Sequence, residues 1–324
     1  MEMEITMKKC ALHSLGCKVN SYETQAMQKM MESAGYEIVP FGEEIADIYI
    51  INTCSVTNIA DRKSRQMIHK AKKLNPEAVV AAAGCYVESA GDNIDEDVDI
   101  VIGNNEKSHL IEILNEYFEH MDKEKSVDIG KATDFDELNI DSPLEHTRAY
   151  VKIQDGCNRF CSYCIIPYVR GRIRSRKPDD VMAEIKRVAA SGCKEVVLTG
   201  IHLSSYGLDF KDSTVKLIDV IEAVNRIEGI ERIRLGSLEP LIVTEEFVRR
   251  LAKCKKICPH FHLSLQSGCD ETLKRMNRRY NVDEYYKGVE LLREYFPDAA
   301  VTTDVIVGFP GETEEEFNLS LIHI

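Results

Sequence analysis

Residues 151–176, "VKIQDGCNRFCSYCIIPYVRGRIRSR", run from a predicted strand straight into three cysteines, Cys157, Cys161 and Cys164. A zinc site would normally show four ligands, as two CxxC pairs or as cysteine with histidine at set spacing. Three thiolates can instead hold three irons of a 4Fe–4S cube and leave one iron open to a substrate. The spacing therefore predicts an open cluster, and a structural zinc loop with a distant fourth ligand is the alternative.

Strand and helix patterns alternate from this loop to the end of the chain. Strands are predicted at 148–154, 195–199, 231–236, 259–265 and 300–307, and helices near 179–191, 216–227, 244–253 and 283–295. Five strands with intervening helices predict a (β/α) barrel or part-barrel. We assign 147–324 to this domain.

The first 120 or so residues show a second alternating series of short apolar strands and helices. Strands are predicted at 8–14, 47–52, 78–83 and 98–102, with helices near 21–34, 58–74 and 106–120. Short apolar strands separated by helices predict a doubly wound α/β domain, with a parallel sheet covered on both faces. This domain is expected to span 1–121, and the acidic, aperiodic segment 122–146 is expected to be a linker.

A second set of cysteines follows the strands of this N-terminal domain. Cys17, Cys54 and Cys85 come just after the first, second and third predicted strands. Because the carboxyl ends of parallel strands meet at one edge of a sheet, we expect the three thiols to converge on a second open cluster. Polar neighbours suited to hydrogen-bonding cluster sulfurs accompany them: Asn20, Asn52 and Thr53. The remaining cysteines are interpreted as core or turn residues without metal: Cys10, Cys193, Cys254, Cys258 and Cys269.

Composition narrows the class of protein. The 324 residues contain eleven cysteines, and no apolar run approaches the roughly 18 residues of a membrane span. Because no signal pattern is evident either, we expect a cytoplasmic protein with no membrane partner, whose cysteines serve metal or redox chemistry.

The net charge of −13 would argue against a nucleic-acid partner if it were evenly spread. Residues 87–147, however, hold 18 acidic and 4 basic side chains, a local balance of 4 − 18 = −14. Basic runs occur elsewhere, at 62–73, 170–177 and 273–279, and two of them lie near the cysteines. An anionic partner is therefore worth considering.

The CxxxCxxC loop after the first strand of a barrel-like series resembles the radical S-adenosylmethionine superfamily. The resemblance implies that the open iron binds S-adenosylmethionine and that an electron splits its sulfonium, giving a 5′-deoxyadenosyl radical. It also implies a set of contacts to S-adenosylmethionine: Tyr163, Thr199, Gly200, Ser237, Glu239 and Gln266. The segment "DVIVGFPGET" (304–313) departs from the superfamily's adenine-side motif, because Asp304 replaces a glycine and Glu312 falls one place late.

With its second cysteine set, the chain resembles the methylthiotransferases over nearly its whole length. That family uses two 4Fe–4S clusters and S-adenosylmethionine, together with an external electron donor and a sulfur donor. "LGCKVNSYE" and "NTCSVTNIADRKSRQ" look most like the branch that acts on threonylcarbamoyladenosine in tRNA. For a tRNA substrate, the phosphate contacts are expected from four arginines of the cysteine loop: Arg170, Arg172, Arg174 and Arg176.

The competing hypotheses are methylthiolation of isopentenyladenosine in tRNA or of a ribosomal protein, and a non-catalytic iron–sulfur electron carrier or scaffold. We expect the family's small C-terminal RNA-binding β domain (TRAM-like) to be absent from this chain. The last six residues, 319–324, resemble an in-frame translation of a sequencing adapter. From these features we expect a C-terminally truncated, incomplete barrel and an inactive polypeptide.

Overall fold

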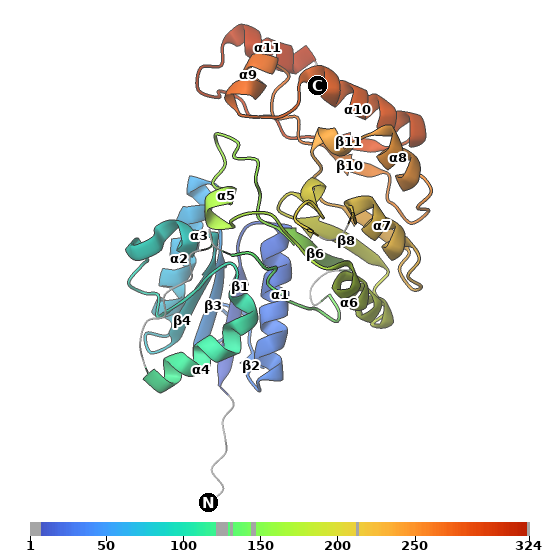
Figure 1. Ribbon diagram of the computed structural model, residues 1–324. Coiled ribbons are helices and arrows are strands. Elements are labelled where there is room, and N and C mark those ends of the chain that lie inside the picture. The colour runs from blue at the N-terminus through green and yellow to red at the C-terminus, as the bar shows by residue number, and fades with distance from the viewer. Residues whose placement is uncertain (1–7, 121–128, 130–131, 144–146, 212–213, 323–324) are drawn as a thin grey trace, which may run out of the picture. The chain divides into compact units, whose positions relative to one another are not determined.

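The computed structural model describes residues 8–120, 129, 132–143, 147–211 and 214–322 (Figure 1). The chain divides into two compact units. Unit 1 comprises residues up to Ile140 together with Tyr168–Arg172, and unit 2 comprises Asp141–Pro167 and Ile173–Ile324.

Unit 1 contains a five-stranded sheet in which every pairing is parallel, in the order β2-β1-β3-β4-β5. Its strands are β1 (Lys9–Ser14), β2 (Glu37–Ile38), β3 (Ile48–Thr53), β4 (Val79–Gly84) and β5 (Ile100–Ile102). Its helices are α1 (Lys18–Ser33), α2 (Asn58–Leu74), α3 (Cys85–Ala90) and α4 (Leu110–His120), with 3₁₀ turns η1 (Gly91–Asn93) and η2 (Lys107–His109). The four longer strands fall at the predicted places, and the two-residue β2 was not predicted.

Both faces of this sheet are covered, because alternate residues of each strand pack on opposite sides. Ile48 and Ile50 of β3 belong to the core beneath α1 and α4, whereas Tyr49 and Ile51 belong to the core beneath α2 and α3. Figure 1 shows α1 and α4 on one face of the sheet. The doubly wound sheet predicted from the sequence is confirmed. Cys10, at 0% exposure, lies in the first of these cores.

Unit 2 is built from a four-stranded sheet in the order β7-β6-β8-β9 and a parallel pair, β10-β11. Its strands are β6 (Ala149–Asp155), β7 (Arg174–Ser175), β8 (Glu195–Gly200), β9 (Arg232–Leu235), β10 (His260–His262) and β11 (Ala300–Thr302). Only β7 runs antiparallel. The isolated parallel bridges Ile233–Ile257 and Leu238–Leu263 continue the series from the β9 segment to the β10 segment. The successive parallel strands confirm the (β/α) part-barrel predicted from the sequence.

The helices of unit 2 follow its strands. They are α5 (Ile166–Val169), which runs across the boundary into unit 1, α6 (Pro178–Ala190), α7 (Leu217–Asn225), α8 (Glu245–Leu251), α9 (Asp270–Arg275), α10 (Val282–Tyr295) and α11 (Glu314–Ile322), with 3₁₀ turns η4 (Leu203–Ser205) and η5 (Pro240–Ile242). Capping fixes some of their starts: the Asn281 side chain accepts from Glu284 N over 2.8 Å at the start of α10. The six-residue α9 and two-residue β7 were missed, because such short elements show no periodicity.

Part of the predicted linker 122–146 lies outside the described residues. In the part that is described, Leu138 and Ile140 are each only 2% exposed. The Tyr22 hydroxyl donates to the Leu138 carbonyl over 2.5 Å, and Asp136 accepts from the amide of Lys107 over 3.2 Å. These residues therefore pack as part of unit 1. Among the described residues, no helix is long and apolar enough to span a membrane.

Candidate functional site

In unit 1, the three cysteines lie at the carboxyl ends of neighbouring strands. Cys17 is the N-cap residue just before α1, Cys54 directly follows β3, and Cys85 is the first residue of α3 after β4. The strand order places β3 between β1 and β4, so the three loops are adjacent along one sheet edge.

Two asparagines and a threonine tie these loops together. The Asn20 amide donates to the carbonyl of Leu15 over 2.7 Å and to that of Thr53 over 2.8 Å, joining the first loop to the second. Asn52 donates to the Asn20 carbonyl over 3.0 Å. The Thr53 hydroxyl donates to the Ala83 carbonyl over 2.5 Å and joins the second loop to the third. All three side chains singled out beside the cysteines thus hold the loops in register.

Glycines let these loops approach closely. Gly16 has φ +100°, and a Cβ built there would lie 2.8 Å from Cys54 Sγ. Gly84 has φ +97°, and its Cβ would lie 2.4 Å from the Thr53 carbonyl oxygen. Both positions combine left-handed backbone with a contact that no side chain could accept. The glycines before Cys17 and Cys85 are therefore part of the site.

The thiols of this set lie close enough to influence one another. Burial raises the pKa of the Cys54 thiol, and the charges of Cys85 and Cys17 raise it further. Burial also raises the pKa of Cys85, while the positive charges of Arg170 and Lys107 and a hydrogen bond from Arg170 act to lower it. Sequence reasoning had not connected Arg170 or Lys107 with this site.

In unit 2, Cys157 follows β6 and the turn residue Gly156, whose φ is +66°. Gln154 at the end of β6 accepts from the His202 amide over 2.6 Å and donates to the Gly156 carbonyl over 2.7 Å. This side chain links the start of the cysteine loop to the segment after β8. The Arg159 amide points back at Cys157 Sγ over 3.4 Å.

The rest of this cysteine loop is held by residues 275–278, at the end of α9 and just after it. The Arg278 guanidinium donates to Cys161 Sγ over 3.3 Å, and the Asn277 amide donates to the Phe160 carbonyl over 2.8 Å. Asn277 and Phe160 both have positive φ, 58° and 51°. The Ser162 hydroxyl adds a bond to the Arg275 carbonyl over 2.9 Å. In the sequence, 273–279 was interpreted only as a basic run, and its contacts with the cysteine loop were not predicted.

Desolvation governs the thiols of this loop as well. Burial raises the pKa of Cys157 to about 11 and also raises that of Cys164, and the nearby Cys161 thiol adds to both shifts. Burial raises the pKa of Tyr163 to about 12 despite the opposing charge of Arg278. Although burial opposes its charge, Arg278 has a raised pKa, because it faces Tyr280, Tyr163 and Cys161.

The side chains expected to contact S-adenosylmethionine occupy different environments. Thr199 and Gly200 end β8, and Gln266, with φ +69°, pairs with Val305. Ser237 is exposed, and Tyr163 is 41% exposed and stacks edge-on against Phe309. Glu239 is only 4% exposed and pairs with Arg159 of the cysteine loop.

Glu312 is already used locally. Its carboxylate accepts from the amides of Gly308 over 2.6 Å and Phe309 over 3.2 Å. Glu312, which falls one place late relative to the superfamily's adenine-side motif, therefore caps its own turn.

The arginines expected to meet RNA phosphates are mostly internal. Arg170, Arg174 and Arg176 are 0–1% exposed and pair with Glu23, Asp155 and Glu184 respectively. Only Arg172 of the four is exposed. Burial contradicts the expectation for these three arginines, because a fully buried guanidinium paired with a carboxylate has no surface left for phosphate.

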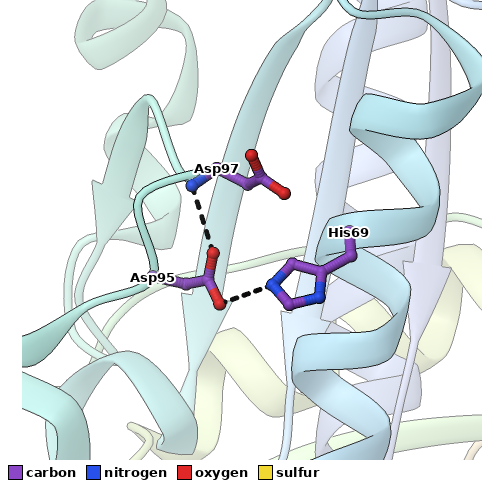
Figure 2. A group of neighbouring side chains, drawn as sticks. All are labelled: His69, Asp95 and Asp97. Carbon is purple, nitrogen blue, oxygen red and sulfur yellow. Dashed lines mark hydrogen bonds and ion pairs between the residues drawn. The ribbon is translucent and has the colours of Figure 1, made fainter.

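The sulfurs of each cysteine set are too widely spaced to share a single metal ion. Among the described residues, neither set brings its three sulfurs within 4.8 Å of one another, as one shared ion would require. The group that does is His69, Asp95 and Asp97 in unit 1 (Figure 2). There His69 pairs with Asp95 over 2.7 Å, and the Asp97 amide donates to the same carboxylate over 3.1 Å. These bonds explain why the three side chains lie together: they connect α2 to the segment before β5.

Both halves of the chain match families of known proteins. Residues 151–321 match the radical SAM superfamily, and residues 9–103 match the uncharacterized protein family UPF0004. Among solved structures, the radical S-adenosylmethionine methyltransferase TsrM from Kitasatospora setae has a TM-score of 0.68 and 14% identity, over 98% of this chain and 70% of that one. The cobalamin-dependent radical enzyme OxsB has a TM-score of 0.67 and 11% identity, over 98% and 52%. At these identities the likeness shows the fold alone.

Curated relatives are considerably more similar. The threonylcarbamoyladenosine tRNA methylthiotransferase MtaB of Bacillus subtilis is 44% identical over 96% of this chain and 69% of its own length. The protein of the same name from Aquifex aeolicus is 43% identical, over 95% and 75%. A tRNA-2-methylthio-N(6)-dimethylallyladenosine synthase of Clostridium botulinum is 36% identical, over 96% and 70%. The chain therefore belongs to the radical S-adenosylmethionine methylthiotransferase family.

Proposed function

We propose that this protein inserts a methylthio group at C2 of threonylcarbamoyladenosine beside the anticodon of tRNA. The observation that carries the proposal is the pair of three-cysteine sites, one at a parallel-sheet edge and one after the first barrel strand. The 44% and 43% identity to proteins named for threonylcarbamoyladenosine, against 36% for a dimethylallyladenosine synthase, supports the choice of nucleoside.

The cofactors of the family are S-adenosylmethionine and two 4Fe–4S clusters. We assign one cluster to Cys17, Cys54 and Cys85 and the other to Cys157, Cys161 and Cys164. A cluster with three thiolate ligands supplies an open iron and an electron for reductive cleavage of S-adenosylmethionine. The chain's part is to hold three thiolates in fixed geometry, which the hydrogen bonds that tie the loops together favour.

S-adenosylmethionine would contact residues at the strand ends of unit 2. Gly200 packs against Gln154, which leaves backbone rather than side chain at that strand end. Glu239 is engaged by Arg159, with His202 Nε2 3.6 Å away, so its role would be to position the cysteine loop. The remaining contacts proposed for the ligand are Tyr163, Thr199, Ser237 and Gln266.

The reaction also needs an electron donor and a source of sulfur, which we propose to be external to the chain. Reaction with tRNA would place the protein in the cytoplasm. For RNA contact the best-placed basic surface is the exposed side of α2, which begins four residues after Cys54 and carries Arg62 and Lys63. Positive charge beside the sulfur site would draw the anticodon stem toward it.

Mass spectrometry of nucleosides tests the substrate. The reconstituted protein, S-adenosylmethionine, a reductant and sulfide are incubated with tRNA from a strain that lacks methylthiotransferases. A methylthio group on threonylcarbamoyladenosine supports the proposal. The same group on dimethylallyladenosine or on a ribosomal protein would overturn the choice of substrate. Four-cysteine ligation of either cluster would favour an electron carrier instead.

A further inference from the structure

Tyr168–Arg172 packs within unit 1, although the residues on both sides of it belong to unit 2. It begins four positions after Cys164, the last cysteine of the other site. The Val169 carbonyl accepts from the Asn104 amide over 2.7 Å, and Val169 is 1% exposed. The N-terminal unit is thus completed by five residues supplied from beyond the second cysteine set.

Arg170 is the central residue of this segment and is 0% exposed. Its guanidinium donates to both carboxylate oxygens of Glu23, over 2.9 and 3.1 Å, and to Asn20 Oδ1 over 2.7 Å. Glu23 also receives Lys107 Nζ at 3.1 Å. A forked pair of this kind fixes the plane of the guanidinium.

The same network borders two of the cysteines. Asn104 Nδ2 lies 4.0 Å from Cys85 Sγ, and its Oδ1 accepts from Lys107 Nζ over 2.7 Å. Asn20 Oδ1, which binds Arg170, lies 4.0 Å from Cys17 Sγ. The carboxylate of Glu88 accepts from the backbone amide of Asn104 over 2.7 Å and belongs to the same network. The positive charge and hydrogen-bonding capacity of Arg170 also act to lower the pKa of the Cys85 thiol.

Burying such a pair is costly, and apolar side chains of equal volume often give equal or greater stability. What an apolar replacement cannot supply is a positive charge fixed beside the cysteines. Positive charge near a cluster, like hydrogen bonds to its sulfurs, stabilises the more negative, reduced state and so raises the reduction potential.

We propose that Arg170 is a positioning residue of the Cys17, Cys54 and Cys85 site, held by Glu23 and Asn20 so that its buried positive charge lies beside these cysteines and raises the potential of the cluster there. The inference rests on the proposed ligation of that cluster and not on the identity of the RNA substrate. It also makes the segment after Cys164 part of the first site.

The test uses the full chain with Cys157, Cys161 and Cys164 changed to alanine, so that only the first cluster can form. In that background Arg170→Met and Arg170→Lys are compared with Arg176→Met. Arg176 is an equally buried arginine paired with Glu184, but in unit 2, so it controls for the loss of any buried ion pair. Iron content and the midpoint potential from an EPR-monitored titration are measured.

We expect Arg170→Met to make reduction about tenfold less favourable, which is about 59 mV for one electron, with Arg170→Lys intermediate and Arg176→Met unchanged. An unchanged potential in Arg170→Met overturns the proposal. If Arg170→Met binds no iron, retention of iron by Arg176→Met supports the proposal, and loss in both overturns it. A parent that binds no iron would instead refute the ligand assignment, and this inference with it.

Discussion

Arg278 donates a hydrogen bond to Cys161 Sγ over 3.3 Å, although 117 positions separate the two residues in the chain. The guanidinium is also placed over the Tyr280 ring, 4.8 Å from its centroid. The Tyr280 hydroxyl in turn donates to the Leu265 carbonyl over 2.7 Å. The second cysteine loop is therefore held from the segment after α9, and not only by its own turns.

Replacing Arg278 should change the electronic properties of the cluster assigned to Cys157, Cys161 and Cys164. With Cys17, Cys54 and Cys85 changed to alanine, we expect Arg278→Met to lower the midpoint potential and to slow reductive cleavage of S-adenosylmethionine about 10- to 100-fold, since partners of metal ligands typically have effects of that size. The neighbouring Arg279→Met is the control, because Arg279 is exposed. Equal rates and potentials in the two variants would contradict the role of Arg278.

A second prediction concerns Gly16. An alanine Cβ there would lie 2.8 Å from Cys54 Sγ, so Gly16→Ala should displace that thiol and lower the iron bound by the first site. Gly35→Ala is a matched control, because Gly35 has a similar φ of +88° but nothing within 4 Å of the added Cβ. Both variants should lose about 1–2 kcal/mol of stability from the left-handed backbone. Iron loss in Gly35→Ala as well would show that strain, not the contact, is responsible.

A third prediction concerns RNA binding by α2. Arg62 and Lys63 are exposed, and among the described residues neither has an ion-pair partner. We expect Arg62→Gln with Lys63→Gln to weaken tRNA binding and to reduce the slope of log affinity against log salt by about 2, because each residue would release counterions from the RNA. Filter binding at several salt concentrations measures this. The exposed pair Lys253→Gln with Lys255→Gln makes the same charge change, and an equal loss there would indicate only a general charge effect.

Much of this architecture could be predicted because its signals are local. The alternation of short apolar strands with helices predicted the parallel sheets of both units. A cysteine shortly after a strand indicated the sheet edge where the thiols lie. The roles proposed for Arg170 and Arg278 could not be predicted this way. Each acts on a cysteine far away in sequence, and in sequence both stand in basic runs that resemble solvated, RNA-binding stretches. The burial of Arg174 and Arg176 depended in the same way on Asp155 and Glu184, which no local pattern pairs with them.

The last prediction concerns Glu239. Burial alone would raise the pKa of this carboxyl, but the hydrogen bond and charge of His202, with the charge of Arg159, hold it below its ordinary value. The ion pair should therefore stabilise the protein above the ordinary pKa of 4.5. This contribution should be lost as the pH falls through the lowered value, where the folded protein takes up the proton.

Glu239→Gln should cost about 2 kcal/mol at pH 7, the usual value for a hydrogen bond to a charged group. In thermal denaturation this corresponds to a melting temperature lower by about 5 °C. The difference in melting temperature between the wild type and the variant should narrow below pH 4.5. Glu228→Gln, at an exposed position of the same unit, should melt like the wild type throughout. If the difference in melting temperature stays constant down to the lowest pH at which the protein folds, Glu239 acts through packing rather than through its charge.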